Sequence, residues 1–292
     1  VMEYAIEVQG LTKHYPGFAL EHVSFSVPSG SIVGFIGENG AGKSTTIKAV
    51  LDLIQKDGGE ITLLGKKDGA ALREVKEQIG VVFDESYFPD NLRVPDVDTI
   101  MRCIFRNWES EKFLSYCRRF ELPEKKMVKT FSRGMKMKLS IAVALSHQTK
   151  LLILDEPTSG LDPVVRNEIL DIFQEFIQEE DHTVFLSSHI TSDIERIADY
   201  ILLIHKGKML LFEDKDTLRY EYGIVRCTRE RAEQIEKSQI VGLRENQFET
   251  EILVKNAGKL QNAADLVVDR ASLDDILLFT VKKDRKERGE RG

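Results

Sequence analysis

The chain has 292 residues, of which 42% are hydrophobic and 30% are charged, a composition typical of a globular protein long enough for one large domain and a smaller appendage. Its formal net charge of −7 argues against a dedicated nucleic-acid-binding protein, which usually has a basic face. The three cysteines, Cys103, Cys117 and Cys227, lie far apart without the spacing of metal ligands, and therefore indicate a reduced, intracellular protein.

The beginning of the chain lacks the pattern of a signal peptide. The longest apolar runs are far shorter than the roughly 18 residues that a helix needs to span a bilayer. We therefore expect any association with a membrane to be peripheral.

Short apolar runs alternate with helical patterns, which predicts an α/β fold with a largely parallel sheet. From about 86 to 148 the strand pattern gives way to helical patterns, which predicts a helical subdomain inserted in the main domain. Strands are expected at 5–8, 23–27, 31–36, 79–83, 151–154, 183–187 and 200–205, and a helix is expected over 43–53.

A linker near 214–222 is expected to precede a small C-terminal α+β appendage at 222–281. The predicted elements of the appendage are strands at 224–227 and 251–255 and helices around 229–237 and 272–279. The charged tail at 282–292 is expected to be disordered.

A glycine-rich loop fits the phosphate-binding pattern G-x-x-x-x-G-K-[ST], and it lies between an expected strand and an expected helix. Glycines let main-chain N–H groups close around phosphate oxygens, and the positive end of the following helix dipole points at them. Lys43 is expected to neutralise phosphate charge, and the Ser44 hydroxyl is expected to bind Mg²⁺. The candidate nucleotide contacts in this loop are Gly37, Asn39, Gly40, Ala41, Gly42, Lys43, Ser44 and Thr45.

The expected strand at 151–154 ends in two carboxylates, Asp155 and Glu156, and resembles the Walker B motif of P-loop ATPases. Asp155 would support Mg²⁺, and Glu156 would polarise the attacking water. Two acidic residues are common at the end of an ordinary strand, so this pair indicates a Walker B motif only in combination with the other motifs of the chain.

Those motifs follow in the order and spacing of ATP-binding cassette (ABC) ATPases, which the chain resembles over 2–213. They are Tyr15 before the P-loop, Phe-Ser-Arg-Gly-Met at 131–135 in the position of the signature motif, Ser-Gly-Leu-Asp at 159–162 in the position of the D-loop, and His189 in the position of the switch histidine.

The resemblance implies a P-loop cassette with an antiparallel β subdomain and a helical subdomain. It also implies that two cassettes, identical or different, dimerise head to tail, with each ATP between one P-loop and the signature motif of the other subunit. Ser132 would then be both a helix N-cap and a phosphate ligand, and Gly134 would keep the backbone close to the nucleotide. Tyr15 would stack on adenine, His189 would act in catalysis, and Asp162 would lie near the nucleotide.

The same resemblance implies an enzyme that hydrolyses ATP with Mg²⁺ and powers membrane-spanning subunits on separate chains. Such a subunit lies peripherally on the cytoplasmic face of the membrane. Export is favoured over import because the signature and the C-terminal extension resemble those of bacterial exporters of the ABC-2 type. The transported molecule is not encoded in this chain, because the membrane subunits form the translocation path.

The chain departs from the family pattern at two motifs. The signature usually reads Leu-Ser-Gly-Gly-Gln, whereas this chain has Arg133 and Met135 at two of its positions. Arg133 would face either the nucleotide of the partner cassette or solvent. Asp84 stands at the position of the Q-loop glutamine, where its carboxylate would contact Mg²⁺ or a water bound to it, and we hypothesise that it tightens the metal dependence.

The helical subdomain of the family holds the groove that receives a membrane subunit. Aromatic residues and a proline in this part of the chain would line either that groove or the core of the subdomain, and the sequence leaves both readings open. They are Tyr87, Phe88, Pro89, Phe105 and Trp108.

Two other classes of function remain as alternatives. A soluble ABC protein that acts on ribosomes or DNA usually carries two cassettes or a long coiled coil, and this acidic chain has one cassette and no long heptad run. A P-loop kinase or regulatory GTPase would leave the signature segment and His189 unexplained.

Overall fold

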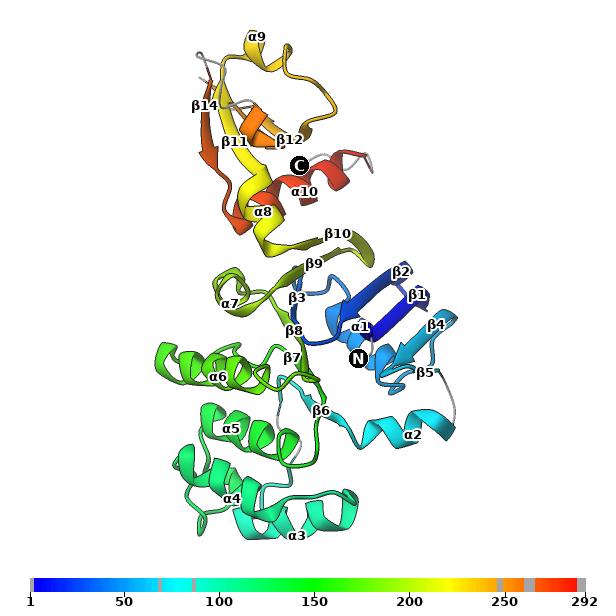
Figure 1. Ribbon diagram of the computed structural model, residues 1–292, viewed down its shortest axis with the longest axis vertical. Coiled ribbons are helices and arrows are strands. Elements are labelled where there is room, and N and C mark those ends of the chain that lie inside the picture. The colour runs from blue at the N-terminus through cyan, green and yellow to red at the C-terminus, as the bar shows by residue number, and fades with distance from the viewer. Residues whose placement is uncertain (1–2, 68–69, 86–87, 246–248, 260–265, 288–292) are drawn as a thin grey trace.

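The computed structural model describes residues 3–67, 70–85, 88–245, 249–259 and 266–287 (Figure 1). The central feature is a six-stranded sheet of order β10-β9-β3-β8-β7-β6. Five of the strands are parallel, and β10 pairs antiparallel with β9 at one edge. The strands are β3 (Ile32–Ile36), β6 (Ile79–Val82), β7 (Leu151–Asp155), β8 (Thr183–Ser188), β9 (Tyr200–His205) and β10 (Lys208–Asp214).

The strands predicted at 31–36, 79–83, 151–154, 183–187 and 200–205 are confirmed within a residue or two. β3 and β7 are buried along their whole length, as expected for parallel strands with both faces covered. The helix predicted over 43–53 is shorter, α1 (Lys43–Val50). β10 was not predicted, because its seven residues are all only partly buried and therefore show no alternation of apolar and polar residues.

A second, antiparallel sheet of order β2-β1-β4-β5 lies beside the central one (Figure 1). Phe185 of β8 connects the two sheets, because its ring stacks on Phe25 of β2 at 5.6 Å and on Phe35 of β3 at 5.3 Å between centroids. The strands of the antiparallel sheet are β1 (Tyr4–Tyr15), β2 (Phe18–Pro28), β4 (Gly58–Leu63) and β5 (Lys66–Lys67), and helix α2 (Ala70–Lys76) follows them.

Helices occupy the part of the chain between β6 and β7, at the end of the molecule opposite the C-terminal segment (Figure 1). Phe113 and Cys117 on α4 are fully buried in the same apolar cluster as Met137 of α5. The elements are α3 (Val94–Ile104), α4 (Ser110–Arg119), a 3-10 turn (Val128–Thr130) and α5 (Arg133–Ala144), and α6 (Pro163–Phe176) and α7 (Thr191–Ile197) follow β7 and β8.

The five residues proposed for the helical subdomain have different environments. Phe88 and Pro89 line a surface cavity together with Val97 of α3. Phe105 lines a second cavity and stacks on His147, whereas Trp108 packs against the core and its indole donates to Asp98 at 2.8 Å. Tyr87 lies outside the described residues.

The C-terminal segment forms a four-stranded antiparallel sheet of order β12-β13-β11-β14 with a helix against it. The strands predicted at 224–227 and 251–255 are confirmed, while β12 and β14 were missed. The elements are α8 (Lys215–Glu221), β11 (Tyr222–Cys227), α9 (Arg229–Ala232), β12 (Ile240–Glu245), β13 (Thr250–Lys255), a 3-10 turn (Ala257–Lys259), β14 (Val267–Arg270) and α10 (Leu273–Glu287).

Two stretches of this segment are helical where no helix was predicted. The expected linker at 214–222 contains helix α8, because the Asp214 side chain caps it by accepting a hydrogen bond from the Thr217 amide at 2.7 Å. The expected disordered tail is helical as far as Glu287, because α10 is anchored through buried Ile276 and Phe279 and continues past them. Residues 288–292 lie outside the described residues.

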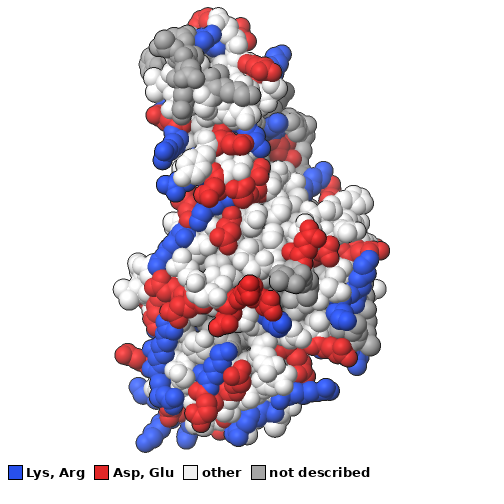
Figure 2. All heavy atoms as spheres, viewed as in Figure 1, with Lys and Arg blue, Asp and Glu red and all other residues white. Residues whose placement is uncertain are grey.

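Acidic and basic side chains are interspersed over the face of the molecule seen in Figure 2. Within the described ranges, no helix combines the length and the apolar character that crossing a bilayer requires.

Candidate active site

The glycine-rich loop connects β3 to α1 at the carboxyl edge of the parallel sheet. Gly40 and Gly42 have φ angles of 82° and 116°, which residues with side chains rarely adopt. A Cβ atom at Gly37 would lie 2.6 Å from the carbonyl oxygen of Ile204. The loop therefore needs glycine at these positions, and it closes just before the first turn of α1, whose N–H groups have no partner within the helix.

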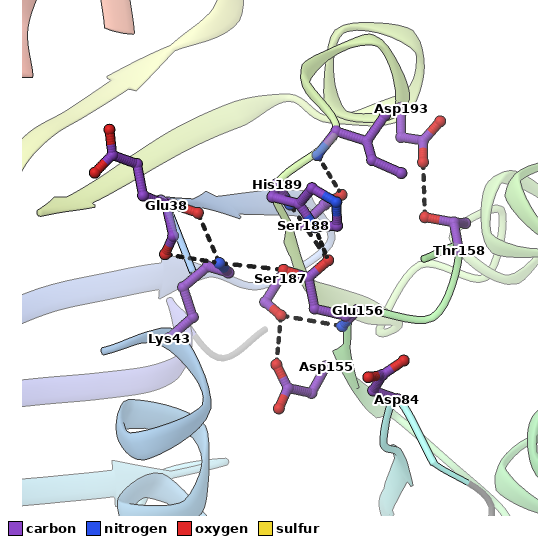
Figure 3. Close-up of polar contacts among 12 residues, drawn as sticks. Glu38, Lys43, Asp84, Asp155, Glu156, Thr158, Ser187, Ser188, His189 and Asp193 are labelled. Carbon is purple, nitrogen blue, oxygen red and sulfur yellow. Dashed lines mark hydrogen bonds and ion pairs between the residues drawn. The ribbon is translucent and has the colours of Figure 1, made fainter. Parts of the chain in front are cut away.

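Lys43 extends into the centre of this loop (Figure 3). Its side chain is 5% exposed, and its ammonium group donates to the Gly37 carbonyl at 2.6 Å. The same nitrogen lies 3.1 Å from Oε1 of Glu156. A buried ammonium needs an anion nearby, and in this structure a carboxylate supplies it.

Asp155 ends β7, and Ser187 near the end of the neighbouring strand β8 holds it. The Ser187 hydroxyl donates to Asp155 at 2.6 Å and accepts from the Glu156 amide at 3.1 Å. Asp155 and Ser187 lie side by side because they are register partners in the parallel strands β7 and β8. Ser187 was not among the predicted site residues, although its position at the end of a predicted strand placed it next to that site.

Glu156 lies between a cation and an imidazole. Its Oε2 atom lies 2.7 Å from Nδ1 of His189, and its Oε1 atom faces Lys43 (Figure 3). The backbone of Glu156 has a φ angle of 55°, an uncommon conformation for a residue with a side chain, and such conformations cluster at functional sites. The structure therefore brings together Lys43, Asp155, Glu156 and His189 from three separate segments.

These residues fit a nucleoside triphosphate and its metal ion. Lys43 and the N–H groups at the start of α1 provide positive charge at the glycine-rich loop. Ser44 is exposed at the first turn of α1, and the Asp155 carboxylate is buried at the end of β7. One hydroxyl and one carboxylate are enough protein ligands for Mg²⁺, which takes its other ligands from phosphates and water.

The signature segment begins α5 in the helical part of the molecule, well separated from α1 in Figure 1. Ser132 is the N-cap of α5 as predicted, since its hydroxyl accepts from the Met135 amide at 3.2 Å. A Cβ at Gly134 would lie 3.3 Å from the Val165 side chain, so a glycine allows α5 to approach the start of α6. Within one chain the signature segment therefore does not join the P-loop cluster.

Arg133 is exposed to solvent, one of the two environments expected for it, and its guanidinium also forms an ion pair with Asp84. Both side chains are about half exposed, at 50% and 48%. The guanidinium also lies close to Gly160 of the D-loop, where an added Cβ would be 3.2 Å from its nearest nitrogen. The Asp84 carboxylate, expected at the metal, thus has a cation of its own chain as its partner.

Two further predicted residues lie at the margins of the site. Asp162 caps α6, and its carboxylate accepts hydrogen bonds from the Val164 and Val165 amides, both at 3.1 Å. Tyr15 ends β1 with 42% of its surface exposed, and Lys13 lies 5.3 Å from the centre of its ring. Phe18, on the next strand, is the aromatic residue that would meet a Cβ atom at Gly42, at 3.0 Å.

Comparisons with known proteins decide which family this site belongs to. The ABC transporter family matches residues 20–159. The bacitracin transport ATP-binding protein of Bacillus licheniformis is 37% identical over 213 residues, which are 72% of this chain and 69% of that protein. The chain belongs to the ABC transporter ATP-binding proteins. It is an ATP-binding and ATP-hydrolysing subunit that works with membrane subunits.

Other relatives and solved structures agree with this assignment. The lantibiotic transport ATP-binding protein of Streptococcus pyogenes is 36% identical over 214 residues, which are 72% of this chain and 91% of that protein. A solved ATP-binding subunit of an ABC transporter is 28% identical with a TM-score of 0.67, over 74% of this chain and 92% of that one. A dimeric cassette bound to ADP and Pi has the same fold at 21% identity, with a TM-score of 0.64 over 72% of this chain and 98% of the other.

Proposed function

We propose that this subunit powers a membrane exporter through ATP-driven, head-to-tail dimerisation of two cassettes, with Mg²⁺ bound at each ATP. The observation that carries the proposal is the position of Glu156, between Lys43 at 3.1 Å and His189 at 2.7 Å. A carboxylate held at the end of the phosphate cradle is suited to act as a general base.

Each residue of the cluster has one task in this proposal. Lys43 and the loop N–H groups bind the phosphates, and Ser44 and Asp155 hold Mg²⁺, which neutralises phosphate charge when bound. Glu156 accepts the proton of the attacking water. His189 holds the Glu156 carboxylate in place, and Ser187 fixes the Asp155 carboxylate through the hydroxyl bond at 2.6 Å.

The need for a second cassette follows from the separation of the two halves of the site. Ser132 and Gly134 lie at the exposed start of α5, while Lys43 and Glu156 are at the edge of the central sheet. A second chain in head-to-tail orientation would bring its own α5 N-terminus to the phosphates, where N–H groups and the helix dipole favour negative charge. Two solved cassettes with this fold are dimers, which is consistent with the pairing of two cassettes.

A cavity of about 370 Å³ next to the Q-loop position offers a docking site for the membrane subunits. It is lined by β6 and α3, and its apolar walls include Phe88, Leu92 and Met101. Ile100 on α3 also lines the cavity and is 38% exposed, which adds apolar surface. Because β6 continues directly into Asp84, a subunit in this cavity would be adjacent to the Asp84–Arg133 pair.

The direction and cargo of transport are inferred from relatives. Relatives covering 72% of this chain are named for the transport of bacitracin and lantibiotics, which are peptide antibiotics. We infer export of an antibiotic-like peptide. Purification of the chain with its membrane subunits, followed by measurement of ATP hydrolysis with added bacitracin, tests this part. Stimulation supports it, and the same rate with and without any peptide antibiotic contradicts it.

The ATPase proposal is tested with the purified chain and its Glu156→Gln variant. We expect Mg²⁺-dependent hydrolysis by the parent chain, and loss of hydrolysis with formation of an ATP-dependent dimer by the variant, measured by light scattering. A variant that hydrolyses ATP at the parental rate would remove Glu156 from its proposed role.

A further inference from the structure

Helix α10 of the C-terminal segment forms one wall of a cavity beside the P-loop. The cavity measures about 420 Å³. Gly37 and Asn39 of the P-loop and His189 of the switch segment line its other side. The appendage therefore reaches the edge of the nucleotide-binding face, which the sequence did not indicate.

One face of α10 is fixed in the core. Ile276 and Phe279 are 1% and 2% exposed, and the Leu273 amide donates to the Glu195 carboxylate of α7 at 3.0 Å. The neighbouring face carries Leu277, Leu278 and Val281, which line the cavity. Leu278 is 41% exposed, so an apolar surface of α10 remains open to solvent beside the site.

A buried histidine lies between this helix and the P-loop. His205 at the end of β9 is 1% exposed. Its Nδ1 atom lies 3.8 Å from Glu38 of the P-loop, and its Nε2 atom lies 3.9 Å from Asp284 of α10. The ring of His205 therefore lies between a carboxylate of the P-loop and a carboxylate of α10, which places this part of α10 close to the loop.

We propose that the apolar face of α10, formed by Leu277, Leu278 and Val281, is part of the interface with a second copy of this chain in the ATP-bound dimer. The proposal rests on the head-to-tail dimer proposed above and extends it to the appendage. It makes α10 a third contact surface, next to the P-loop and the signature segment.

Two observations favour a second copy as the occupant. The first is continuity, because the cavity shares Gly37, Asn39 and His189 with the face that a second cassette would cover. The second is complementarity. Val164 at the start of α6 is 76% exposed, the highest value among the large apolar side chains of the described residues. It adjoins Val165, which packs against Gly134 of the signature segment, and a signature segment facing the P-loop would bring Val164 with it.

The experiment compares two leucines of equal exposure in the Glu156→Gln background. Leu278 lines the cavity, while Leu243 on β12 of the same appendage is also 41% exposed but does not line it. The dissociation constant of the ATP-bound dimer is measured by analytical ultracentrifugation for Leu278→Asp and Leu243→Asp. Binding of a fluorescent ATP analogue to the monomers checks that both variants fold and bind nucleotide. We expect Leu278→Asp to weaken the dimer at least tenfold and Leu243→Asp to leave it unchanged.

A second measurement tests whether the ATP-bound dimer covers the apolar face of α10. Cysteine is introduced at 278 or 243 in a chain in which the exposed Cys103 is replaced by serine. Maleimide labelling is then followed with and without ATP. We expect ATP to slow labelling at 278 by tenfold or more and to leave labelling at 243 unaffected.

The outcomes separate the two proposals. If the Glu156→Gln chain dimerises with ATP but both aspartate variants dimerise equally well and position 278 stays reactive, α10 is not at the interface and the dimer proposal survives. If the chain does not dimerise with ATP at all, both proposals fail. Protection of 278 only when membrane subunits are present would also overturn a second copy as the occupant.

Discussion

Arg133 and Asp84 form an ion pair within one chain, joining the start of the signature helix α5 to the loop that follows β6. These two residues are the main departures from the family pattern, and the structure places one against the other. The charge that Asp84 adds near Asp155 and Glu156 is therefore balanced by a cation from the signature segment. A pair exposed by about half contributes little to stability, on the order of 0–1 kcal/mol. We therefore infer that the pair serves to position α5 relative to the loop that follows β6.

Breaking this pair should affect activity more than stability. We expect Arg133→Ala and Asp84→Asn each to lower the free energy of unfolding by less than about 1 kcal/mol. Each should slow ATP hydrolysis severalfold, because α5 loses its tie to the Q-loop. The double exchange Asp84→Arg with Arg133→Asp restores opposite charges and should recover part of the rate. If the exchanged chain is slower than both single variants, the pair does not act as a positioning device.

Burial of His147 predicts a pH dependence of stability. Its ring is 1% exposed and stacks on Phe105, and this burial lowers its pKa from the ordinary value of 6.5. The unfolded chain therefore binds a proton at His147 below about pH 6.5 that the folded chain does not bind, so stability falls as the pH falls. Urea unfolding between pH 7 and 5 should show a slope that is smaller in His147→Gln, by at most about 1.4 kcal/mol per pH unit. Equal slopes in the two proteins would contradict the prediction.

The cysteines should differ sharply in reactivity. Cys117 is buried in the helical core, and burial raises the pKa of its thiol to about 12, so the reactive thiolate is nearly absent at neutral pH. Cys103 is exposed on α3. Iodoacetamide at pH 8 should therefore label Cys103 within minutes and leave Cys117 unmodified in the native protein, as read by peptide mass spectrometry. Modification of both at the same rate would indicate that the helical core opens readily.

The site was more predictable than the fold around it, for a physical reason. Binding phosphate and Mg²⁺ restricts residue types at fixed spacing, so Lys43, Asp155, Glu156 and His189 could be recognised before their segments were brought together. β4 and β10 have no such constraint. β4 is only partly buried, and its pairing with β1 depends on a partner about 50 residues away, which a local pattern does not reveal.

The relations between segments were the least predictable. Nothing local to Arg133 or Asp84 indicates that they meet, since the pair joins residues 49 positions apart. The last helix was predicted to end near residue 279, because Lys282 and Lys283 are exposed charges, typical of a solvated tail. The backbone continues helically beneath them because the preceding turns are anchored by Ile276 and Phe279.

The central claim is that an ATP site is built from two chains, and mixing two inactive variants tests it most directly. Lys43→Ala removes the cation of the P-loop, and Ser132→Arg blocks the signature segment. Each variant alone should be inactive, because both sites of its dimer are defective. In a mixed dimer, one site combines an intact P-loop from one chain with an intact signature segment from the other. We predict that the mixture regains a substantial part of the parental ATPase rate. A mixture as inactive as its two components would contradict the composite site.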